Sequence, residues 1–290
     1  MIRRAVFYLN HVKTDVFQTA KECAAVCRRY GIAPLLLSAD EEAWRTRFSE
    51  EPPETVDMPA QADAIFVFGG DGTVLRAMDE YVELGRPFLG INLGRLGFLP
   101  EVQTGEMDAA IERVSRGADT LEHRMMLSYT AESRTGRISG YATNEVSVSR
   151  GLSQRMIAMD VRADGVLVEH YIADGVLAAS PTGSTAYSLS AGGPIISPDV
   201  QCLLVNPICP HTLVSRPIIL SDRCELEINL NMREKREGIQ LSADGVTLCE
   251  LSVGDRVLLR RSPSDALMLR LGTERNFYSL LKSKLVQSYL

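Results

Sequence analysis

The sequence predicts two structural classes in succession: an α/β domain with a parallel, doubly wound type of sheet, then an all-β domain of the β-sandwich kind. Two observations predict this order. At the start of the chain, short apolar strands alternate with segments of helical periodicity. From Leu121 to about Leu271, short alternating or β-branched runs follow one another between turn signals. We therefore expect a first domain over residues 1–120 and a second over residues 121–271.

The first domain opens with a strand, a helix and a second strand. Ala5–Leu9 is a short apolar run, and residues 15–31 have helical periodicity, with Thr14 as the N-cap. Ala33–Leu37 is the next apolar run. Residues 38–59 are polar and rich in Glu and Pro, which predicts a loop with one helical turn.

The second half of this domain repeats the alternation. Ala62–Phe68 is a buried strand that ends abruptly in the letters GGDGT, and a helix is expected from Thr73 to Leu84. A strand over Phe88–Asn92 and a helical segment over residues 107–117 follow. Strands that alternate with helices predict a parallel sheet.

In the second domain, turn signals separate the strand-like runs. Asp164-Gly165, Asp174-Gly175 and Asp244-Gly245 are typical of tight turns between strands. The chain ends differently, in a segment over about residues 272–290. Its apolar residues recur at helical spacing, which predicts an amphipathic helix; they are Phe277, Leu280, Leu281 and Leu285.

Composition excludes several classes of protein. The 290 residues are 45% hydrophobic and 23% charged, which is typical of a folded globular protein. Thirty-one Lys and Arg against 37 Asp and Glu give a net charge of −6, so we expect neither nucleic acid nor a membrane surface as a partner. No apolar run approaches the length of a membrane span or a signal peptide, and we expect a cytoplasmic location. Six cysteines without a CxxC pair predict reduced thiols and no metal centre.

The letters GGDGT, at residues 69–73, occur where α/β sheets bind ligands, after a buried strand and before a helix. Gly69, Gly70 and Gly72 let backbone N–H groups approach phosphate oxygens, and the helix N-terminus adds positive potential. A carboxylate repels phosphate, so Asp71 makes sense as a general base or a Mg²⁺ ligand. The structural alternative is a tight turn with a helix-capping Asp. The P-loop and GxSxG patterns are absent, and Leu75 replaces the third glycine of GxGxxG.

Two further signals lie in the second domain. Residues 174–198 are dense in Ser, Thr, Gly and Ala, which suits a surface lying close against a planar or polar ligand, with Tyr187 available for stacking and Asp174 as an acceptor. The alternative is a Gly-Pro-rich crossing between strands. Asn144 and Glu145 are adjacent polar residues in an otherwise apolar run and suit the hydroxyls of a ribose, unless they are a solvated strand end.

Taken in this order, the three motifs resemble those of the NAD kinase family. GGDGT alone is shared with diacylglycerol and sphingosine kinases and with phosphofructokinases, whereas PTGSTAYSLSAGGP, within residues 174–198, is far more specific. The resemblance covers most of the chain. It implies an N-terminal α/β domain, a C-terminal β-rich domain, and a terminal helix that docks back on the first domain.

The resemblance also implies a role for individual residues. Asp71 would be the general base on the adenosine 2′-hydroxyl of NAD, and Gly69, Gly70, Gly72 and Thr73 would bind the phosphate donor. The residues expected to bind NAD are Asp71, Gly72, Arg76, Asn144, Glu145, Arg155, Asp174, Thr185, Ala186, Tyr187 and Ser190.

The reaction that the resemblance implies is Mg²⁺-dependent phosphoryl transfer from ATP or polyphosphate to NAD, giving NADP, in a homodimer or homotetramer. The glycine turn binds phosphates and no base, so the choice between the two donors stays open. The uncharged residues 171–173 likewise leave the choice between NAD and NADH open. Two alternatives remain: a lipid kinase that shares GGDGT, and a dinucleotide sensor without catalysis.

Overall fold

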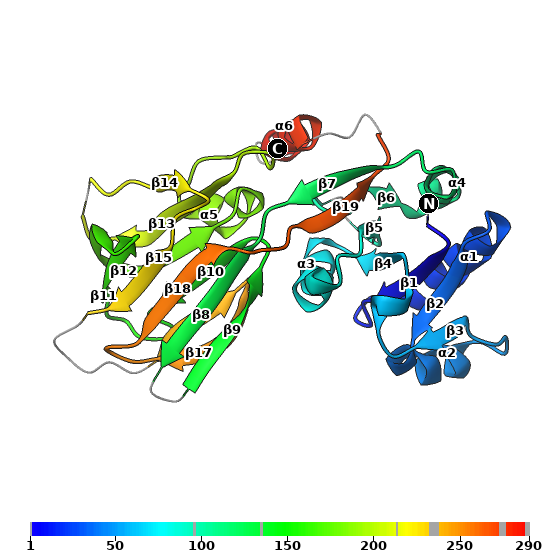
Figure 1. The fold of residues 1–290 in the computed structure, drawn as a ribbon, viewed down its shortest axis with the longest axis horizontal. Helices are drawn as coiled ribbons and strands as arrows, with labels where there is room; N and C mark the ends of the chain where they lie inside the picture. Colours follow the sequence, from blue (N-terminus) through cyan, green and yellow to red (C-terminus); the bar gives the residue numbers. More distant parts are fainter. Residues whose placement is uncertain are drawn as a thin grey trace. The chain divides into compact units, whose positions relative to one another are not determined.

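The computed structural model describes residues 2–94, 97–133, 136–212, 214–231, 238–272 and 277–287. The chain folds into two compact units, Met1–His123 with Ala266–Leu290, and Arg124–Asp265 (Figure 1). The expected second domain extended to residue 271, but the strand over Ala266–Arg270 belongs to the first unit. Its pairing with a strand of that unit's sheet decides this, and no local pattern in the sequence encodes such a pairing.

A largely parallel sheet of eight strands organises the first unit, in the order β3-β2-β1-β4-β5-β19-β7 with β6 also beside β5. Its strands are β1 (Arg4–Leu9), β2 (Ala33–Leu37), β3 (Glu54–Val56), β4 (Ala64–Gly69), β5 (Phe88–Asn92), β6 (Val102–Gln103), β7 (Thr120–Arg124) and β19 (Ala266–Arg270). The central strands run parallel, since Phe7 of β1 is opposite Phe66 of β4, and Phe66 is opposite Leu89 of β5. The carboxyl ends of β1, β4 and β5 therefore meet at one edge.

Helices cover both faces of this sheet. They are α1 (Val16–Arg29), α2 (Glu41–Arg47), α3 (Asp71–Tyr81) and α4 (Met107–Ser115), with 3₁₀ turns at residues 38–40, 59–61, 82–84 and 104–106. The unit also contains the terminal helix α6 (Phe277–Gln287), whose Phe277 ring packs against Phe98. Phe7, Phe66 and Leu89 pack in one cluster with α1 and α4. Residues next to them in sequence point to the opposite face, where α3 contacts β4 and β5. The doubly wound α/β prediction is confirmed.

Two local predictions for this unit differ from the structure, and a third lies partly outside the described residues. The N-cap of α1 is Asp15 and not Thr14. The segment after β2 contains a two-turn helix, α2, because Trp44 is buried and its ring packs edge-on against Phe17 and Phe48. In the terminal helix, residues 273–276 and 288–290 and the side chain of Leu285 lie outside the described part of the chain.

The second unit is all-β and antiparallel. Its strands are β8 (Leu127–Ser133), β9 (Gly136–Ala142), β10 (Glu145–Ser149), β11 (Ile157–Ala163), β12 (Val166–Ala179), β13 (Cys202–Pro210), β14 (Ile218–Ser221), β15 (Leu226–Leu230), β16 (Ile239–Ala243), β17 (Val246–Leu251) and β18 (Arg256–Arg261). A 3₁₀ turn at residues 182–185 and a short helix, α5 (Tyr187–Ser190), follow β12. Alternate residues of β8, β11 and β15, among them Tyr129, Met159 and Ile228, share one core, as period-2 strands require.

Two of the three Asp-Gly pairs form turns. Asp164 and Asp244 have φ of 51° and 46°, and the glycines after them have φ of 80° and 78°, so both hairpins turn through left-handed residues. The prediction of a turn at Asp174-Gly175 is wrong, because both residues lie inside β12. A Cβ on Gly175 would come within 2.5 Å of the Val148 carbonyl oxygen, so this glycine permits close packing against β10.

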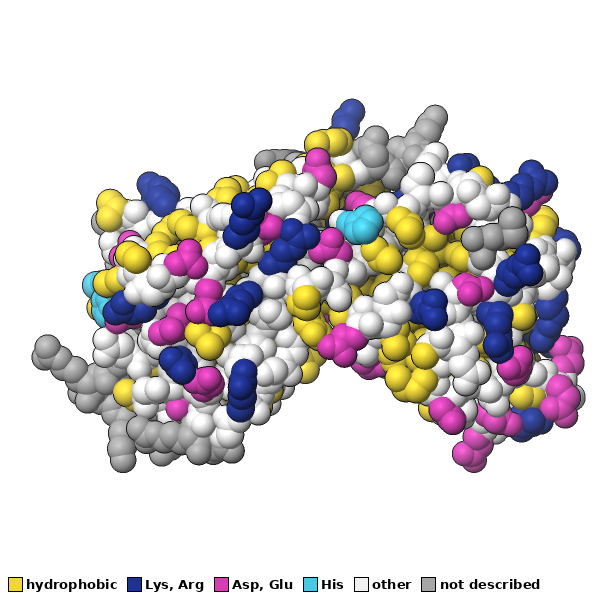
Figure 2. Space-filling model, viewed as in Figure 1, with side chains coloured by type: hydrophobic (Ala, Val, Ile, Leu, Met, Phe, Trp, Pro, Cys, Tyr) yellow, Lys and Arg dark blue, Asp and Glu magenta, His cyan; other side chains and the backbone are white. Residues whose placement is uncertain are grey.

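The described surface is mixed in charge. On the face shown in Figure 2, Lys and Arg side chains alternate with Asp and Glu over both units, without a broad area of one sign. Among the described helices, none combines the length and the hydropathy that crossing a membrane requires.

Candidate functional site

The glycine turn joins β4 to α3 at the carboxyl edge of the sheet. Gly69 ends β4, and a Cβ there would lie 2.2 Å from Thr73 Oγ1, so packing within the turn requires this glycine. Gly70 and Gly72 differ, because a Cβ on either would meet nothing within 4 Å and neither has a left-handed φ. No contact with a described residue explains these two glycines, and their backbone faces open space at the start of α3.

Asp71 is the first residue of α3, and its carboxylate is held from outside the helix. The backbone N–H of Phe98 donates to Oδ2 and that of Leu99 donates to Oδ1, both at 3.0 Å. A Cβ on Gly97 would lie 1.9 Å from Oδ1, so the loop approaches this closely only with glycine there. A helix-capping Asp would accept N–H groups of its own helix, so the structural alternative for Asp71 is wrong.

Side chains from the neighbouring strand ends complete this edge. Asn10, directly after β1, donates from Nδ2 to Thr73 Oγ1 at 2.8 Å. Asn92, the last residue of β5, is 4% exposed and donates to the Gly94 carbonyl at 2.8 Å. The sequence analysis missed both residues, although each stands where an apolar run ends. Farther along α3, Arg76 lies on the same exposed side as Gly72, one helical turn away.

In the second unit, the peptide groups around Asn144 are held on both sides. The carboxylate of Asp244 accepts the backbone N–H groups of Thr143, Asn144 and Glu145 at 2.7–2.9 Å. The Asn144 carbonyl accepts the N–H of Ser180 at 2.8 Å. Asp244 is thus a site residue that the sequence analysis recognised only as part of a turn.

The carboxyl group of Glu145 is buried and incompletely bonded. The residue is 6% exposed, and its Oε2 has no hydrogen-bond partner among the described residues. Burial, with the charge of Asp244 added, raises the pKa of Glu145 to about 7. Burial also raises the pKa of Asp244, while its three N–H bonds act in the opposite direction. Glu145 therefore releases its proton only near neutral pH.

Asp174 lies where β12 changes partners. The strand pairs with β11 up to Ala173 and with β10 from Gly175 onward. The Asp174 carboxylate accepts from Arg150 Nε at 2.6 Å, an ion pair that the sequence analysis missed. On the neighbouring strand β13, Cys209 has a φ of 46°, an uncommon conformation for a residue other than glycine. Arg155 lies exposed in the turn after β10, and its N–H donates to Ser153 Oγ at 3.2 Å.

Buried serines hold the small-residue segment after β12. Ser180, Ser184 and Ser188 are fully buried and hydrogen-bond within the unit; the Ser180 hydroxyl, for example, donates to the Thr143 carbonyl at 2.5 Å. The sequence-predicted residues of this segment that remain at least partly exposed are Thr185, Ala186, Tyr187 and Ser190. The charges of Asp174 and Glu145 add to the partial burial that raises the pKa of Tyr187. These three side chains thus belong to one neighbourhood of the second unit.

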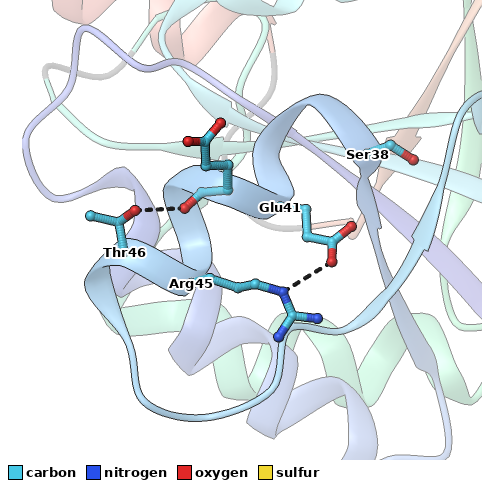
Figure 3. A pocket seen from close by; sticks show the side chains of 5 residues that line it. Ser38, Glu41, Arg45 and Thr46 are labelled. Carbon is cyan, nitrogen blue, oxygen red and sulfur yellow. Dashed lines mark hydrogen bonds and ion pairs between the residues drawn. The ribbon is translucent and has the colours of Figure 1, made fainter.

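The other candidate sites among the described residues offer fewer side chains that could bind a ligand. A surface depression along α2 is lined by Ser38, Glu41, Glu42, Arg45 and Thr46 (Figure 3). Its polar groups bond to one another or to nearby residues, since Arg45 pairs with Glu41 and Glu51. Within the described ranges, no three His, Cys, Asp or Glu side chains are grouped so that they could hold a metal ion. All six cysteines are free thiols.

The comparisons with known proteins agree over both units. Residues 33–118 match the model of the ATP-NAD kinase N-terminal domain, and residues 143–271 match that of the ATP-NAD kinase C-terminal domain. The NAD kinase of Desulforamulus reducens is 38% identical over 279 residues, which are 96% of this chain and 95% of that protein. The NAD kinase of Symbiobacterium thermophilum is 44% identical over 227 residues, or 78% of this chain and 79% of that protein.

Two solved structures are similar as well. The yeast NADH kinase complexed with NADH superposes with a TM-score of 0.87 at 26% identity, covering 98% of this chain and 87% of that one. An NAD kinase from Archaeoglobus fulgidus in complex with ATP superposes with a TM-score of 0.72 at 25% identity, covering 97% of both chains.

Proposed function

This chain belongs to the NAD kinase family, and from that membership we propose how its residues carry out the phosphorylation of NAD. The chain is a kinase that transfers a phosphoryl group to NAD. The observation that carries the residue-level proposal is the carboxylate of Asp71, held by two backbone N–H groups beside the open glycine turn. In phosphoryl transfer to a hydroxyl, an oriented carboxylate next to a phosphate-binding turn can accept the proton of that hydroxyl.

Asp71 is the general base. Each of its oxygens accepts one backbone N–H, so lone pairs remain to accept the proton of the adenosine 2′-hydroxyl. The 2′-oxygen forms a bond to the terminal phosphorus of the donor, the bridging P–O bond breaks, and the shortened donor leaves. In phosphoryl transfer the protein itself does little covalent chemistry. The position of this carboxylate therefore contributes most to turnover.

The donor's phosphates bind to the backbone N–H groups at the start of α3. Gly70 and Gly72 leave that backbone open, and the helix N-terminus favours negative charge. Arg76 extends this positive region along the exposed side of the helix. ATP is the donor that we propose first, because the similar structure from Archaeoglobus fulgidus is a complex with ATP. Polyphosphate offers the same phosphate chemistry to these residues.

NAD binds to the second unit through a mixed polar and aromatic surface. Asn144 and a protonated Glu145 suit ribose hydroxyls, since a carboxylic acid both donates and accepts. Tyr187 is 43% exposed and can stack on a ring. The further NAD contacts proposed here are Arg155, Asp174, Thr185, Ala186 and Ser190. We propose NADH as a second acceptor, because the similar yeast enzyme is an NADH kinase.

We propose Mg²⁺ as the cofactor of this phosphoryl transfer. The residues around the glycine turn fit an ion that binds together with the phosphate donor. The described residues contain no cluster of three acidic, His or Cys side chains, but Asp71 provides one carboxylate at the phosphate-binding turn. Mg²⁺ in kinases is commonly held by one or two carboxylates together with substrate phosphates. When bound, the ion neutralises charge on the phosphates.

We further propose a homodimer or homotetramer in the cytoplasm. Apolar side chains near the proposed NAD surface are exposed, including Ile172, Leu189 and Ile219 at 48%, 36% and 54%. Their burial against a second copy would be favourable. Six free thiols, four of them buried, suit a reducing compartment. Light scattering at working concentration tests the assembly, and a monomer would contradict it.

The decisive experiment is a coupled assay of NADP formation from NAD, ATP and Mg²⁺, repeated with polyphosphate and with NADH. We expect Asp71→Asn to lose most of the turnover while NAD still binds in equilibrium dialysis. Asp57→Asn is the matched control, because it makes the same chemical change at an exposed position outside the site. An Asp71→Asn variant with wild-type kcat would contradict the assignment of the base. Binding of NAD without ATP consumption by the wild type would instead support a sensor.

A further inference from the structure

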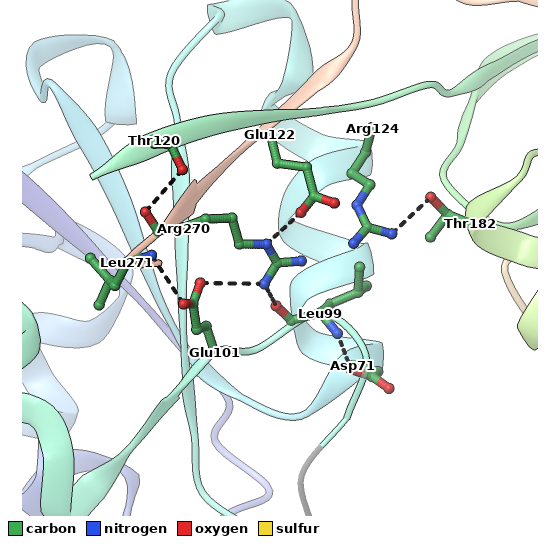
Figure 4. A network of polar contacts seen from close by, with 9 residues as sticks. All are labelled: Asp71, Leu99, Glu101, Thr120, Glu122, Arg124, Thr182, Arg270 and Leu271. Carbon is green, nitrogen blue, oxygen red and sulfur yellow. Dashed lines mark hydrogen bonds and ion pairs between the residues drawn. The ribbon is translucent and has the colours of Figure 1, made fainter. Parts of the chain in front are cut away.

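A polar network extends from Asp71 to the strands β19 and β7 of the same sheet (Figure 4). Its centre is Arg270, the last residue of β19, whose side chain is 19% exposed. Arg270 Nη1 donates to the Leu99 carbonyl at 3.1 Å and lies 3.6 Å from Glu101 Oε2, while Nε donates to Glu122 of β7. All of these residues belong to the first unit.

Leu99 connects this network to Asp71. Its N–H donates to the Asp71 carboxylate, and its carbonyl accepts from Arg270. Leu99 is 2% exposed and lies between β5 and β6, outside helix and strand, so no regular ladder orients its peptide groups. The Glu101 N–H attaches the end of this loop to the sheet by donating to the Gly90 carbonyl at 3.2 Å. The N–H and the carbonyl of Leu99 belong to adjacent peptide groups that meet at its Cα, so a bond that fixes the carbonyl also restricts the direction of the N–H.

The guanidinium is itself held firmly. Glu101, directly before β6, and Glu122 of β7 both contact it, and the second oxygen of Glu101 accepts the N–H of Leu271 at 3.0 Å. A planar guanidinium with donors on two nitrogens can satisfy a carboxylate and a carbonyl together, which the single ammonium of lysine does less well. With so little freedom, Arg270 is suited to hold a backbone oxygen in place.

We propose that Arg270 is a positioning residue for the base: it holds the carbonyl of Leu99 and thereby orients the N–H that aims the Asp71 carboxylate. This inference rests on the proposed role of Asp71. Arg270 lies 171 positions from Leu99 in sequence, and nothing in its local sequence marks it as functional. A misplaced catalytic group lowers the rate of the chemical step more than it lowers the affinity for substrate.

The experiment measures kcat and KM for NAD and ATP in the full-length enzyme, well below the melting temperature of each variant. Arg270→Gln should lower kcat by roughly 10- to 100-fold, with both KM values within about twofold of wild type. Arg270→Lys keeps the charge between the two glutamates and should recover part of kcat. Equilibrium binding of NAD should be unchanged, a result that general unfolding would not give.

Two controls separate positioning from stability. Glu122→Gln removes one carboxylate from the guanidinium but keeps the bond to Leu99, so kcat should stay within about threefold of wild type. Arg261→Gln deletes an arginine that also pairs with two carboxylates, those of Asp222 and Asp265, in the second unit, and should leave kcat unchanged.

Several outcomes would overturn the inference. These are a folded Arg270→Gln or Arg270→Lys with wild-type kcat while Asp71→Asn is inactive, or a Glu122→Gln that loses as much kcat as Arg270→Gln. If Arg270→Gln does not fold, Arg270→Lys and Glu122→Gln decide the question. An active Asp71→Asn in the same assay would instead contradict the proposed function.

Discussion

Glu145 gives the second unit a stability that depends on pH, and Glu145→Gln should remove that dependence. The pKa of Glu145 rises from the ordinary 4.5 to about 7 because the carboxyl is buried and faces the charge of Asp244. The folded protein therefore holds a proton that the unfolded chain has released. Between these two pH values the folded state binds more protons, so stability falls as pH rises.

The magnitude follows from the size of the shift. A pKa difference of one unit corresponds to about 1.4 kcal/mol, so the rise from 4.5 to about 7 is worth about 3 kcal/mol of unfolding free energy. The full stability is present below pH 4.5 and is lost by the time the pH passes about 7. The residue is only 6% exposed, so screening by solvent reduces the effect little. Gln has nearly the same shape and does not ionise, so its variant should not show this loss.

The assay is calorimetric or urea-induced unfolding of wild type and Glu145→Gln from pH 5 to pH 8, without nucleotide. Fluorescence is unsuitable, because the single tryptophan, Trp44, lies in the first unit. The quantity to compare is the difference between the two proteins at each pH, since titration of other groups cancels in it. Glu145→Gln should gain stability relative to wild type with rising pH, by about 2.5 kcal/mol between pH 5 and pH 8.

Glu250→Gln is the matched control, because it makes the same change of charge at an exposed position of β17. Its stability should follow the wild type across the pH range. Parallel curves for wild type and Glu145→Gln would refute the reasoning, since they would mean that Glu145 is already ionised at pH 5 in the folded protein. Hydrogen exchange of the β10 amides gives an independent local measurement of the same effect.

Three further substitutions have defined expectations. Asp244→Asn removes the charge from a carboxylate that accepts three backbone N–H groups. The free energy of unfolding should therefore fall by about 2 kcal/mol, and KM for NAD should rise. An unchanged melting temperature would contradict this. Gly97→Ala puts a methyl 1.9 Å from Asp71 Oδ1, so kcat should fall at least tenfold; a wild-type kcat would mean that the loop adjusts freely. Gly70→Ala meets no protein atom within 4 Å, so melting should hardly change while KM for the donor rises; an unchanged KM would show that phosphate does not bind there.

The sequence by itself determined the class of each unit and the location of its motifs. Period-2 and period-3.6 patterns are local, so the strands β1, β2, β4 and β5 of the first sheet and the turns at Asp164 and Asp244 were predictable from neighbouring residues. The position of Asp71 after a buried strand was predictable for the same reason. So was the family, because its motifs are contiguous runs of residues.

Only the tertiary structure decided which distant residues hold those motifs. Asp244 bonds to the N–H of Asn144 from 100 positions away, and Arg270 reaches the Leu99 carbonyl across 171. Asp174-Gly175 resembles a turn locally but lies inside β12, since pairing with β10 outweighs the local preference. Contacts of this kind depend on how strands pair and pack across the whole unit, and a local pattern carries no record of that pairing.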